Sequence, residues 1–221
     1  MEMITFKNFT VKYGDKTVFD GFNLDVSLSG NTAVLGESGS GKTTLLNAIA
    51  GLVPFSGEVS GVPQKISAAF QENRLVPCLT VKENLALATG EEGIDYDLES
   101  FALSDKAQSY PSRLSGGEKR RVALLRAYRF NAPLYILDEP FNSLDLKLKI
   151  RLEELFKKRV KDNSAALLFV THDIKEAVSL ADRIIVVSGD GGVCKIVADV
   201  KSVNEKTEEY LFGLLSGKLK A

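Results

Sequence analysis

The stretch Gly36-Glu37-Ser38-Gly39-Ser40-Gly41-Lys42-Thr43 decides the fold of this 221-residue chain, because it fits the phosphate-loop pattern G-x-x-x-x-G-K-[ST]. An apolar strand is expected before it, over residues 32–35, and a helix after it, over residues 43–50. Glycines let the backbone curl so that successive N–H groups point at phosphate oxygens, and the helix start adds a partial positive charge. The sequence therefore predicts a strand, a phosphate-binding loop and a helix.

The residue types of this loop suit triphosphate chemistry. We expect the ammonium group of Lys42 to reach the β- and γ-phosphates and the hydroxyl of Thr43 to ligate Mg²⁺. A flexible surface turn is the alternative, and the strand-loop-helix context argues against it. The residues expected to contact the nucleotide are Gly36, Glu37, Ser38, Gly39, Ser40, Gly41, Lys42, Thr43 and Thr44.

Before the loop, apolar and polar residues alternate from Ile4 to Leu28, with turn signals at 13–16 and 28–31. This pattern predicts antiparallel strands with one solvent-exposed face. After the loop, four further segments read as strands and three as helices. The strand segments are 65–70, 134–137, 166–170 and 183–188; the helical segments are 81–128, broken by a polar stretch at 89–97, then 146–160 and 205–215.

The fully apolar segments 134–137 and 166–170 are typical of strands in the buried centre of a parallel sheet. Strands that alternate with helices indicate an α/β fold. We therefore predict a P-loop NTPase core with a mainly parallel sheet. An antiparallel β subdomain at the N-terminus and a helical subdomain are added to it.

Two carboxylates end one of these strands, in Leu134-Tyr135-Ile136-Leu137-Asp138-Glu139-Pro140. Asp138 suits the Mg²⁺ shell, reached through water, and Glu139 suits a base that polarises the attacking water. Ordinary solvated acids at a strand terminus are the alternative, which the preceding phosphate loop disfavours.

The segment Leu114-Ser115-Gly116-Gly117-Glu118, together with the two motifs above, resembles the signature sequence of ABC ATPases. A helix start with Ser115 as N-cap would leave N–H groups facing an anion. Ser-x-x-Glu is also a capping box, so a plain capped helix is the alternative. The resemblance implies ATP as ligand, and implies that Ser115, Gly116 and Gly117 meet the γ-phosphate held by the other subunit of a dimer.

The resemblance covers nearly the whole chain and assigns four further residues. It implies that Tyr13 stacks on adenine and that Gln71 contacts Mg²⁺ and water. It implies that Asp145, in Ser143-Leu144-Asp145, lies in a loop that crosses the dimer interface, and that His172 is a switch histidine that hydrogen-bonds the γ-phosphate. With these assignments the expected catalytic residues are Glu139, His172, Gln71 and Lys42, and the expected metal ligands are Thr43, Gln71 and Asp138.

The chain departs from the family pattern in two places. Glu118 stands where Gln is commoner. The segment between Gln71 and Leu114 is shorter than the family leads us to expect, which predicts a shortened helical subdomain. We expect a single ABC ATPase domain over residues 1–221, with the helical subdomain at 72–130 inserted within a core formed by 1–71 and 131–221.

The amino-acid composition limits the kinds of partner that we expect for this chain. Lys and Arg number 28 against 29 Asp and Glu, so no global field attracts nucleic acid, and no nucleic-acid partner is expected. The longest apolar runs fall far short of the ~20 residues that cross a bilayer, and no signal peptide is seen. Cys78 and Cys194 lack metal-ligand spacing and are expected to be reduced thiols. The chain is therefore expected to be soluble, with any membrane part supplied by another chain.

Residues 70–84 and 181–187 resemble importer ATPases of the nitrate, sulfonate and taurine type. That resemblance implies integral-membrane permease subunits as partners, and a head-to-tail homodimer, or a pair with a related ATPase, on ATP binding. An extracytoplasmic substrate-binding protein belongs to such complexes, and the expected location is cytoplasmic, peripheral on the inner face of the cell membrane. A soluble ABC ATPase of a cluster-assembly or other non-transport complex is the alternative.

In the importer family, a groove beside the glutamine receives a short helix from the permease. Arg74, Leu75, Val76 and Leu79 would form its exposed rim in this chain. Internal packing of these apolar residues is the alternative, and both can hold in part.

Overall fold

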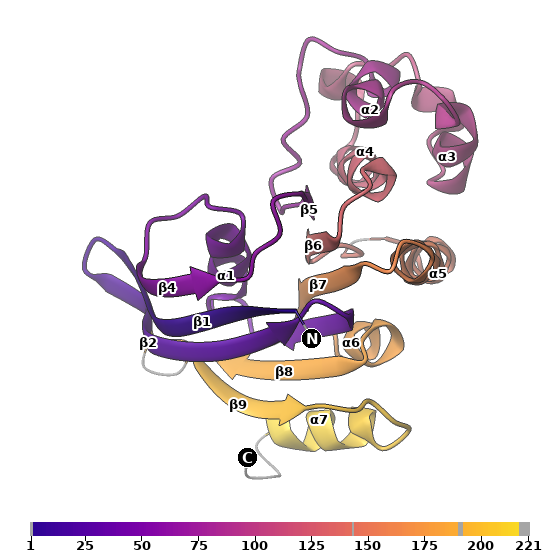
Figure 1. The fold of residues 1–221 in the computed structure, drawn as a ribbon. Coiled ribbons are helices and arrows are strands. Elements are labelled where there is room, and N and C mark those ends of the chain that lie inside the picture. Colours follow the sequence, from indigo (N-terminus) through magenta and orange to yellow (C-terminus); the bar gives the residue numbers. More distant parts are fainter. Residues whose placement is uncertain (1, 143, 190–191, 217–221) are drawn as a thin grey trace.

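The computed structural model of the chain describes residues 2–142, 144–189 and 192–216. Two sheets and a group of helices make up the molecule (Figure 1). The larger sheet has the order β5-β6-β7-β3-β8-β9, and the smaller has the order β2-β1-β4. The strands are β1 (Met3–Tyr13), β2 (Lys16–Ser27), β3 (Gly30–Leu35), β4 (Ser56–Ser60), β5 (Ile66–Ala69), β6 (Leu134–Asp138), β7 (Ala166–Thr171), β8 (Arg183–Ser188) and β9 (Lys195–Val200).

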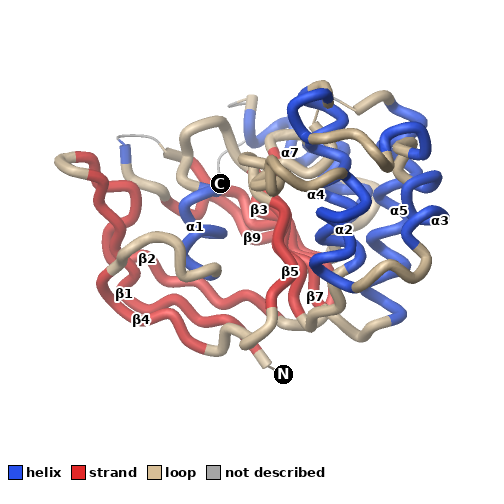
Figure 2. Tube along the Cα trace, turned by 90° about the horizontal axis from the view of Figure 1, so that it is seen from above, coloured by secondary structure: helices blue, strands red, loops and turns tan. Residues whose placement is uncertain are grey.

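Helices lie on one face of the larger sheet and at its edge, and the smaller sheet lies on the other side together with α1 (Figure 2). The α-helices are α1 (Lys42–Ile49), α2 (Val81–Thr89), α3 (Ile94–Ser100), α4 (Gly116–Arg129), α5 (Leu146–Asp162), α6 (Ile174–Leu180) and α7 (Thr207–Leu215). Two short 3-10 turns, Ser104–Lys106 and Pro111–Arg113, connect α3 to α4.

The parallel core of the larger sheet positions the site. β5, β6, β7, β3 and β8 pair in parallel, and Val170 on β7 is opposite both Val34 on β3 and Asp138 on β6. The carboxyl ends of parallel strands meet at one edge, where ligands bind in open α/β sheets. The phosphate loop after β3, Asp138 at the end of β6 and His172 after β7 therefore lie at the same edge.

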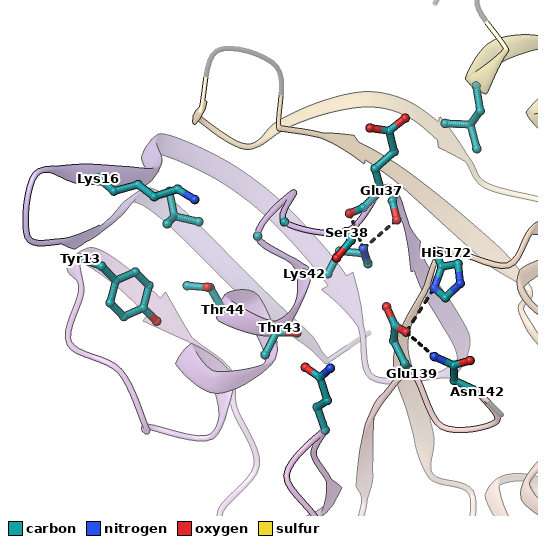
Figure 3. A pocket seen from close by; sticks show the side chains of 16 residues that line it. Tyr13, Lys16, Glu37, Ser38, Lys42, Thr43, Thr44, Glu139, Asn142 and His172 are labelled. Atoms are coloured by element: carbon teal, nitrogen blue, oxygen red, sulfur yellow. Dashed lines mark hydrogen bonds and ion pairs between the residues drawn. The ribbon is translucent and has the colours of Figure 1, made fainter.

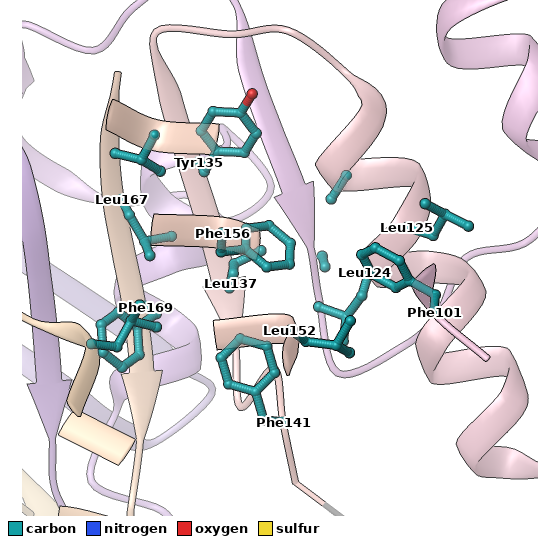
Figure 4. Close-up of a cluster of buried hydrophobic side chains, with 14 of the residues drawn as sticks. Phe101, Leu124, Leu125, Tyr135, Leu137, Phe141, Leu152, Phe156, Leu167 and Phe169 are labelled. Atoms are coloured by element: carbon teal, nitrogen blue, oxygen red, sulfur yellow. The ribbon is translucent and has the colours of Figure 1, made fainter. Parts of the chain in front are cut away.

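Alternation along the buried strands divides the core in two. On β6, Tyr135 and Leu137 face the helices, where they join a cluster with Phe156 of α5 (Figure 4). Leu134 and Ile136, on the same strand, join the opposite cluster with α1 and the smaller sheet. Successive side chains of a strand point to opposite faces, so a strand that reads as a continuous apolar run serves both cores.

The expected antiparallel start is confirmed by the pairing of β1 with β2. Two strands were missed, β4 and β9, and each is an antiparallel edge strand. Both are largely exposed or half-buried, so neither carries the apolar run or the clean alternation that marks a strand in sequence. The helix α6, which follows His172, was also missed.

The expected break in the helical segment at 89–97 is wrong in extent. Between α2 and α3 only residues 90–93 interrupt it, since α3 begins at Ile94. A second interruption, residues 101–115 with the two 3-10 turns, separates α3 from α4 and was not predicted. Gly90 and Gly93 have φ of 75° and 72°, which separates the two helices. The polar residues misled the prediction: Ile94 and Leu98 bury one face of α3, while Asp97 pairs with Arg129 of α4.

Candidate active site

A cavity of about 870 Å³ opens at the carboxyl edge of the larger sheet (Figure 3). Six segments far apart in sequence contribute to it: the β1–β2 turn, the phosphate loop, Gln71, the residues after β6, the residue after β7, and the end of α7. Most of the residues predicted from sequence line it together. They are Tyr13, Gly36, Glu37, Ser38, Gly39, Gly41, Lys42, Thr43, Thr44, Gln71, Glu139 and His172.

The helix that follows the loop has a free N-terminus. Gly41 is the N-cap of α1, and no side chain caps the helix there. The first N–H groups of a helix have no intrahelical partner, so at α1 they are available to an anion. The ammonium group of Lys42 donates to the carbonyl oxygens of Gly36 and Glu37, at 2.7 Å each, which centres the positive charge in the loop.

Two glycines of the loop have no substitute in this backbone. A Cβ on Gly36 would lie 2.3 Å from the carbonyl oxygen of Val187 on β8. Gly41 has a φ of 100°, a region that side-chain-bearing residues rarely adopt, and a Cβ there would meet Val18 at 3.0 Å. The pattern of glycines in the motif therefore reflects close packing against β8 and β2 as well as the curl of the loop.

Asp138 and Thr43 form the part of the site that suits a metal ion. Asp138 is 1% exposed, and its Oδ2 atom has no hydrogen-bond partner within the described residues. Burial raises the pKa of its carboxyl group, whereas the hydrogen bond with the Thr43 hydroxyl lowers it. A buried carboxylate oxygen without a partner, beside a hydroxyl, fits Mg²⁺ with water in its shell.

The carboxylate of Glu139 lies between two nitrogen donors. Its Oε2 is 3.2 Å from His172 Nδ1 and accepts from Asn142 Nδ2 at 3.2 Å (Figure 3). The backbone of Glu139 has a φ of 47°, one of five positive values among the described non-glycine residues. Glu139, directly after β6, and His172, directly after β7, thus face the same cavity as Lys42.

Tyr13 lies at the opposite end of the cavity from Glu139 and is 48% exposed. An exposed ring at the mouth of a nucleotide-sized cavity is free to stack on a base. Lys16 and Val18, on β2, line the cavity beside Tyr13, and the sequence interpretation did not include them as site residues. Their position directly after the Tyr13 turn is the signal that could have indicated them.

Burial shifts the pKa of Lys42 downward. The negative charges of Glu139 and Asp138 oppose this shift and favour the ammonium form. Bringing the loop lysine and both acids to one edge therefore helps to keep the lysine charged.

Some predicted residues do not line this cavity. Ser40 is buried within the loop, at 3% exposure. Asp145 caps α5, since its side chain accepts from the N–H of Leu148 at 3.0 Å. Ser143 lies outside the described residues. Within one copy of the chain, Asp145 is not brought to the phosphate loop.

The signature segment also lies away from the phosphate loop. Gly116 and Gly117 line a separate cavity of about 310 Å³ together with Gln71, Glu139 and Asn142. Ser115 is the N-cap of α4, and both hydrogen bonds of the capping box are present. Glu118, the departure from the family pattern, accepts from Ser115 N at 2.7 Å and lies 3.3 Å from Lys106. The capped-helix alternative is thus present, and Gly116 and Gly117 remain open at the helix start.

Asn142 was missed by the sequence interpretation, although it lines both of these cavities. An amide three residues after Glu139 is the available signal, because a tight turn brings residues of that spacing together. Leu215, the last residue of α7, lines the larger cavity as well and has no sequence signal of this kind.

The sheet order, the uncapped loop helix and the paired acids define a nucleotide-hydrolysing cassette of the P-loop class. The model of the ABC transporter family matches residues 19–142 of the chain. The chain belongs to this family, and it is an ATP-hydrolysing subunit that uses ATP with Mg²⁺.

Curated relatives and solved structures agree with this assignment. The chain is 40% identical over 194 residues to the aliphatic sulfonates import ATP-binding protein SsuB 2 of Rhodococcus jostii, covering 85% of this chain and 80% of the relative. It is 43% identical over 180 residues to SsuB 3 of Paraburkholderia xenovorans, covering 79% and 72%. These relatives do not favour a soluble cluster-assembly ATPase.

Two solved dimeric structures of one cassette have the same fold as this chain. One is a bacterial ABC transporter cassette, with a TM-score of 0.77 and 30% identity over 91% of this chain and 99% of that chain. The other is a post-hydrolysis dimer bound to ADP and phosphate, with a TM-score of 0.76, 29% identity and the same coverage. Among the described residues, none of the helices is both long and apolar enough to cross a bilayer.

Proposed function

We propose that the chain is the motor of an importer. Two copies, or one copy and a related ATPase, pair head to tail on binding ATP and drive transport through separate integral-membrane permease subunits. The motor acts in the cytoplasm, peripherally on the inner face of the cell membrane. An extracytoplasmic substrate-binding protein delivers the transported molecule.

The observation that carries the pairing is the separation of the signature from its own phosphate loop. Gly116 and Gly117 open onto a cavity that does not include the loop, while Tyr13, Lys42 and His172 line the larger one. In this proposal each copy holds an incomplete site, and a helix start that is capped by Ser115 but open at Gly116 and Gly117. Head-to-tail pairing places the start of α4 from one copy against the nucleotide of the other, where its N–H groups favour the γ-phosphate.

Within each site the residues have distinct roles in this proposal. The loop N–H groups and Lys42 bind the β- and γ-phosphates, and Tyr13 stacks on adenine. Thr43, Asp138 and Gln71 hold Mg²⁺, which neutralises charge on the phosphate oxygens when bound.

Glu139 accepts a proton from the attacking water. The water oxygen bonds to the γ-phosphorus as the bond to the β–γ bridging oxygen breaks, which yields ADP and phosphate. His172 orients Glu139 and donates to the γ-phosphate.

Complementation between two inactive variants tests the pairing. Lys42→Ala removes the phosphate-loop charge, and Ser115→Arg fills the helix start; each variant alone should hydrolyse little ATP. In a mixed head-to-tail pair, one of the two sites receives an intact loop and an intact signature. ATPase activity of the mixture should therefore exceed that of either variant at the same total concentration. A mixture no more active than its components refutes the pairing.

Glu139→Gln tests the base. This variant should bind ATP and migrate as a dimer in ATP on size-exclusion chromatography, with kcat lowered by about 10²-fold or more. Glu154→Gln, an exposed change on α5, is the matched control and should remain at the wild-type rate. Wild-type hydrolysis by Glu139→Gln would show that the base is assigned wrongly.

The permease-facing surface lies beside Gln71. Arg74 is exposed, with its guanidinium group 4.5 Å from the centroid of the Phe70 ring, whereas Leu75 packs against the core. Val76 and Leu79 are half-buried. Exposure at the rim and internal packing therefore both hold in part: Arg74 is exposed, and the three apolar side chains are half-buried.

The names of the relatives suggest the cargo. We propose an aliphatic sulfonate or a related small organic anion, bound by the permease and the substrate-binding protein. Cells that lack this chain should fail to grow on an alkanesulfonate as sole sulfur source and should grow normally on sulfate. Unimpaired growth on every sulfonate tested would refute the proposal that sulfonates are the transported molecules, and would leave the ATPase assignment intact.

A further inference from the structure

A guanidinium group on α4 lies behind the catalytic carboxylates. Arg120 donates to the carbonyl oxygens of Phe70, Asp138 and Glu139, the last at 2.9 Å. Phe70 directly precedes Gln71. The Arg120 side chain is thus hydrogen-bonded to the backbone at two places. One is beside Gln71, and the other is at Asp138 and Glu139.

Glu139 needs such a restraint. Its φ of 47° lies in the left-handed region, which a side-chain-bearing residue keeps only where its surroundings enforce it. The N–H of Glu139 donates to Val170 on β7 at 2.9 Å, which fixes one side of the residue. Arg120 fixes the other side through the carbonyl oxygen. The direction of the Glu139 side chain, toward His172, follows from this backbone conformation.

The same helix carries the signature. α4 starts at Gly116, and Arg120 is one helical turn further along. Gly116, Gly117 and Arg120 line the smaller cavity with Glu139. A hydrogen-bonded helix moves as a rigid unit over one turn, so a displacement of the α4 start changes the position of the Arg120 guanidinium group.

We propose that Arg120 is a positioning residue that holds the backbone of Glu139 and couples it to the start of α4. The coupling rests on the head-to-tail pairing proposed above: the partner's nucleotide engages the helix start, and Arg120 passes that engagement to the base of its own site. Arginine suits this task because its planar fork presents five N–H donors, enough for three carbonyl acceptors in fixed directions. A lysine has the charge but only a single nitrogen.

The test compares Arg120→Met and Arg120→Lys with Lys119→Met in the full-length chain. Lys119 is adjacent on α4, and the structure records no side-chain hydrogen bond or ion pair for it within the described residues. Arg120→Met should lower kcat by about tenfold or more with KM for ATP within about twofold, because ATP binding does not pass through Glu139. Arg120→Lys should lie between Arg120→Met and wild type, and Lys119→Met should equal wild type.

A second comparison separates positioning from general damage. In the Glu139→Gln background, adding Arg120→Met should leave the residual hydrolysis rate unchanged, because a residue that acts through Glu139 has nothing left to position. A further multiplicative loss in that background would overturn the proposal, as would a kcat for Arg120→Met equal to that of Lys119→Met. If Arg120→Met fails to fold, Arg120→Lys, which keeps the charge, gives the same comparison.

These outcomes are distinguishable from failure of the proposed function. Wild-type hydrolysis by Glu139→Gln removes the base itself, whatever Arg120 does. An inactive Glu139→Gln together with a fully active Arg120→Met removes only the positioning role. Lack of complementation between the loop and signature variants removes the coupling through the partner.

Discussion

Replacing Arg129 with Met should destabilise the helical region formed by α2, α3 and α4. Arg129 lies near the end of α4, and its side chain is 6% exposed. It pairs with Asp97 and donates to the Thr89 hydroxyl at 2.9 Å. It also donates to the carbonyl oxygens of Gly90 and Glu92, at 3.2 Å and 2.8 Å. One side chain thus closes the turn between α2 and α3.

The size of the effect follows from what is left unpaired. Removing one partner of a buried ion pair costs about 3–5 kcal/mol. Asp97 keeps 20% of its side chain exposed, and residues 90–93 are exposed, so water replaces part of what is lost. We therefore expect a loss of about 3 kcal/mol in the free energy of unfolding, at the low end of that range. For a chain of this size that lowers Tm by about 6–12 °C.

Urea unfolding followed by circular dichroism measures this loss. Arg113→Met, at an exposed arginine, is the control and should change the free energy of unfolding by less than about 0.5 kcal/mol. Adding Asp97→Asn to Arg129→Met should cost less than the sum of the single changes, because the unpaired charge is gone. A loss for Arg129→Met no larger than that for Arg113→Met refutes the reasoning.

Three further outcomes are expected. Tyr13→Ala should raise KM for ATP by about 5- to 30-fold through lost stacking, while Tyr13→Phe stays near wild type. If Tyr13→Ala has the wild-type KM in a steady-state assay, Tyr13 does not belong to the adenine site. Burial raises the pKa of Glu176 from 4.5 to about 7, so folding favours the protonated carboxyl group. Its contribution to the free energy of unfolding is fully present below pH 4.5 and is lost as the pH rises through 7. Glu176→Gln should flatten this dependence in unfolding measurements at pH 5.5 and 8, and an unchanged slope would contradict it. Iodoacetamide should modify exposed Cys78 in the native chain and spare Cys194, because burial raises the pKa of Cys194 to about 12. Mass spectrometry measures both reactions, and rapid modification of Cys194 would contradict this expectation.

Much of the fold could be predicted because its signals are local. The apolar runs at β6 and β7 indicated buried parallel strands, and the carboxyl ends of such strands meet at one edge. That rule supports the expectation that Asp138 lies beside the phosphate loop, whereas His172 was assigned to the same site by the family resemblance. The edge strands β4 and β9 were missed, because an exposed edge places few demands on its side chains.

The helical region illustrates the limit of local signals. Polar residues around Asp97 were taken for a break, although two buried positions four residues apart, Ile94 and Leu98, carry a helix. Asp97 belongs to that helix because Arg129, 32 residues away, supplies its partner. A contact between residues so far apart in sequence cannot be predicted from a local pattern.

The sequence by itself determined the phosphate loop, since its glycines, lysine and helix start act within one contiguous stretch. It also indicated Asp138 and Glu139 through their position after a buried strand. Only the tertiary structure brought Arg120 to the backbone of Glu139, because its carbonyl partners lie 18 to 50 residues away in sequence and meet α4 through packing. The separation of Gly116 and Gly117 from their own loop was likewise decided in three dimensions, where α4 opens onto a different cavity.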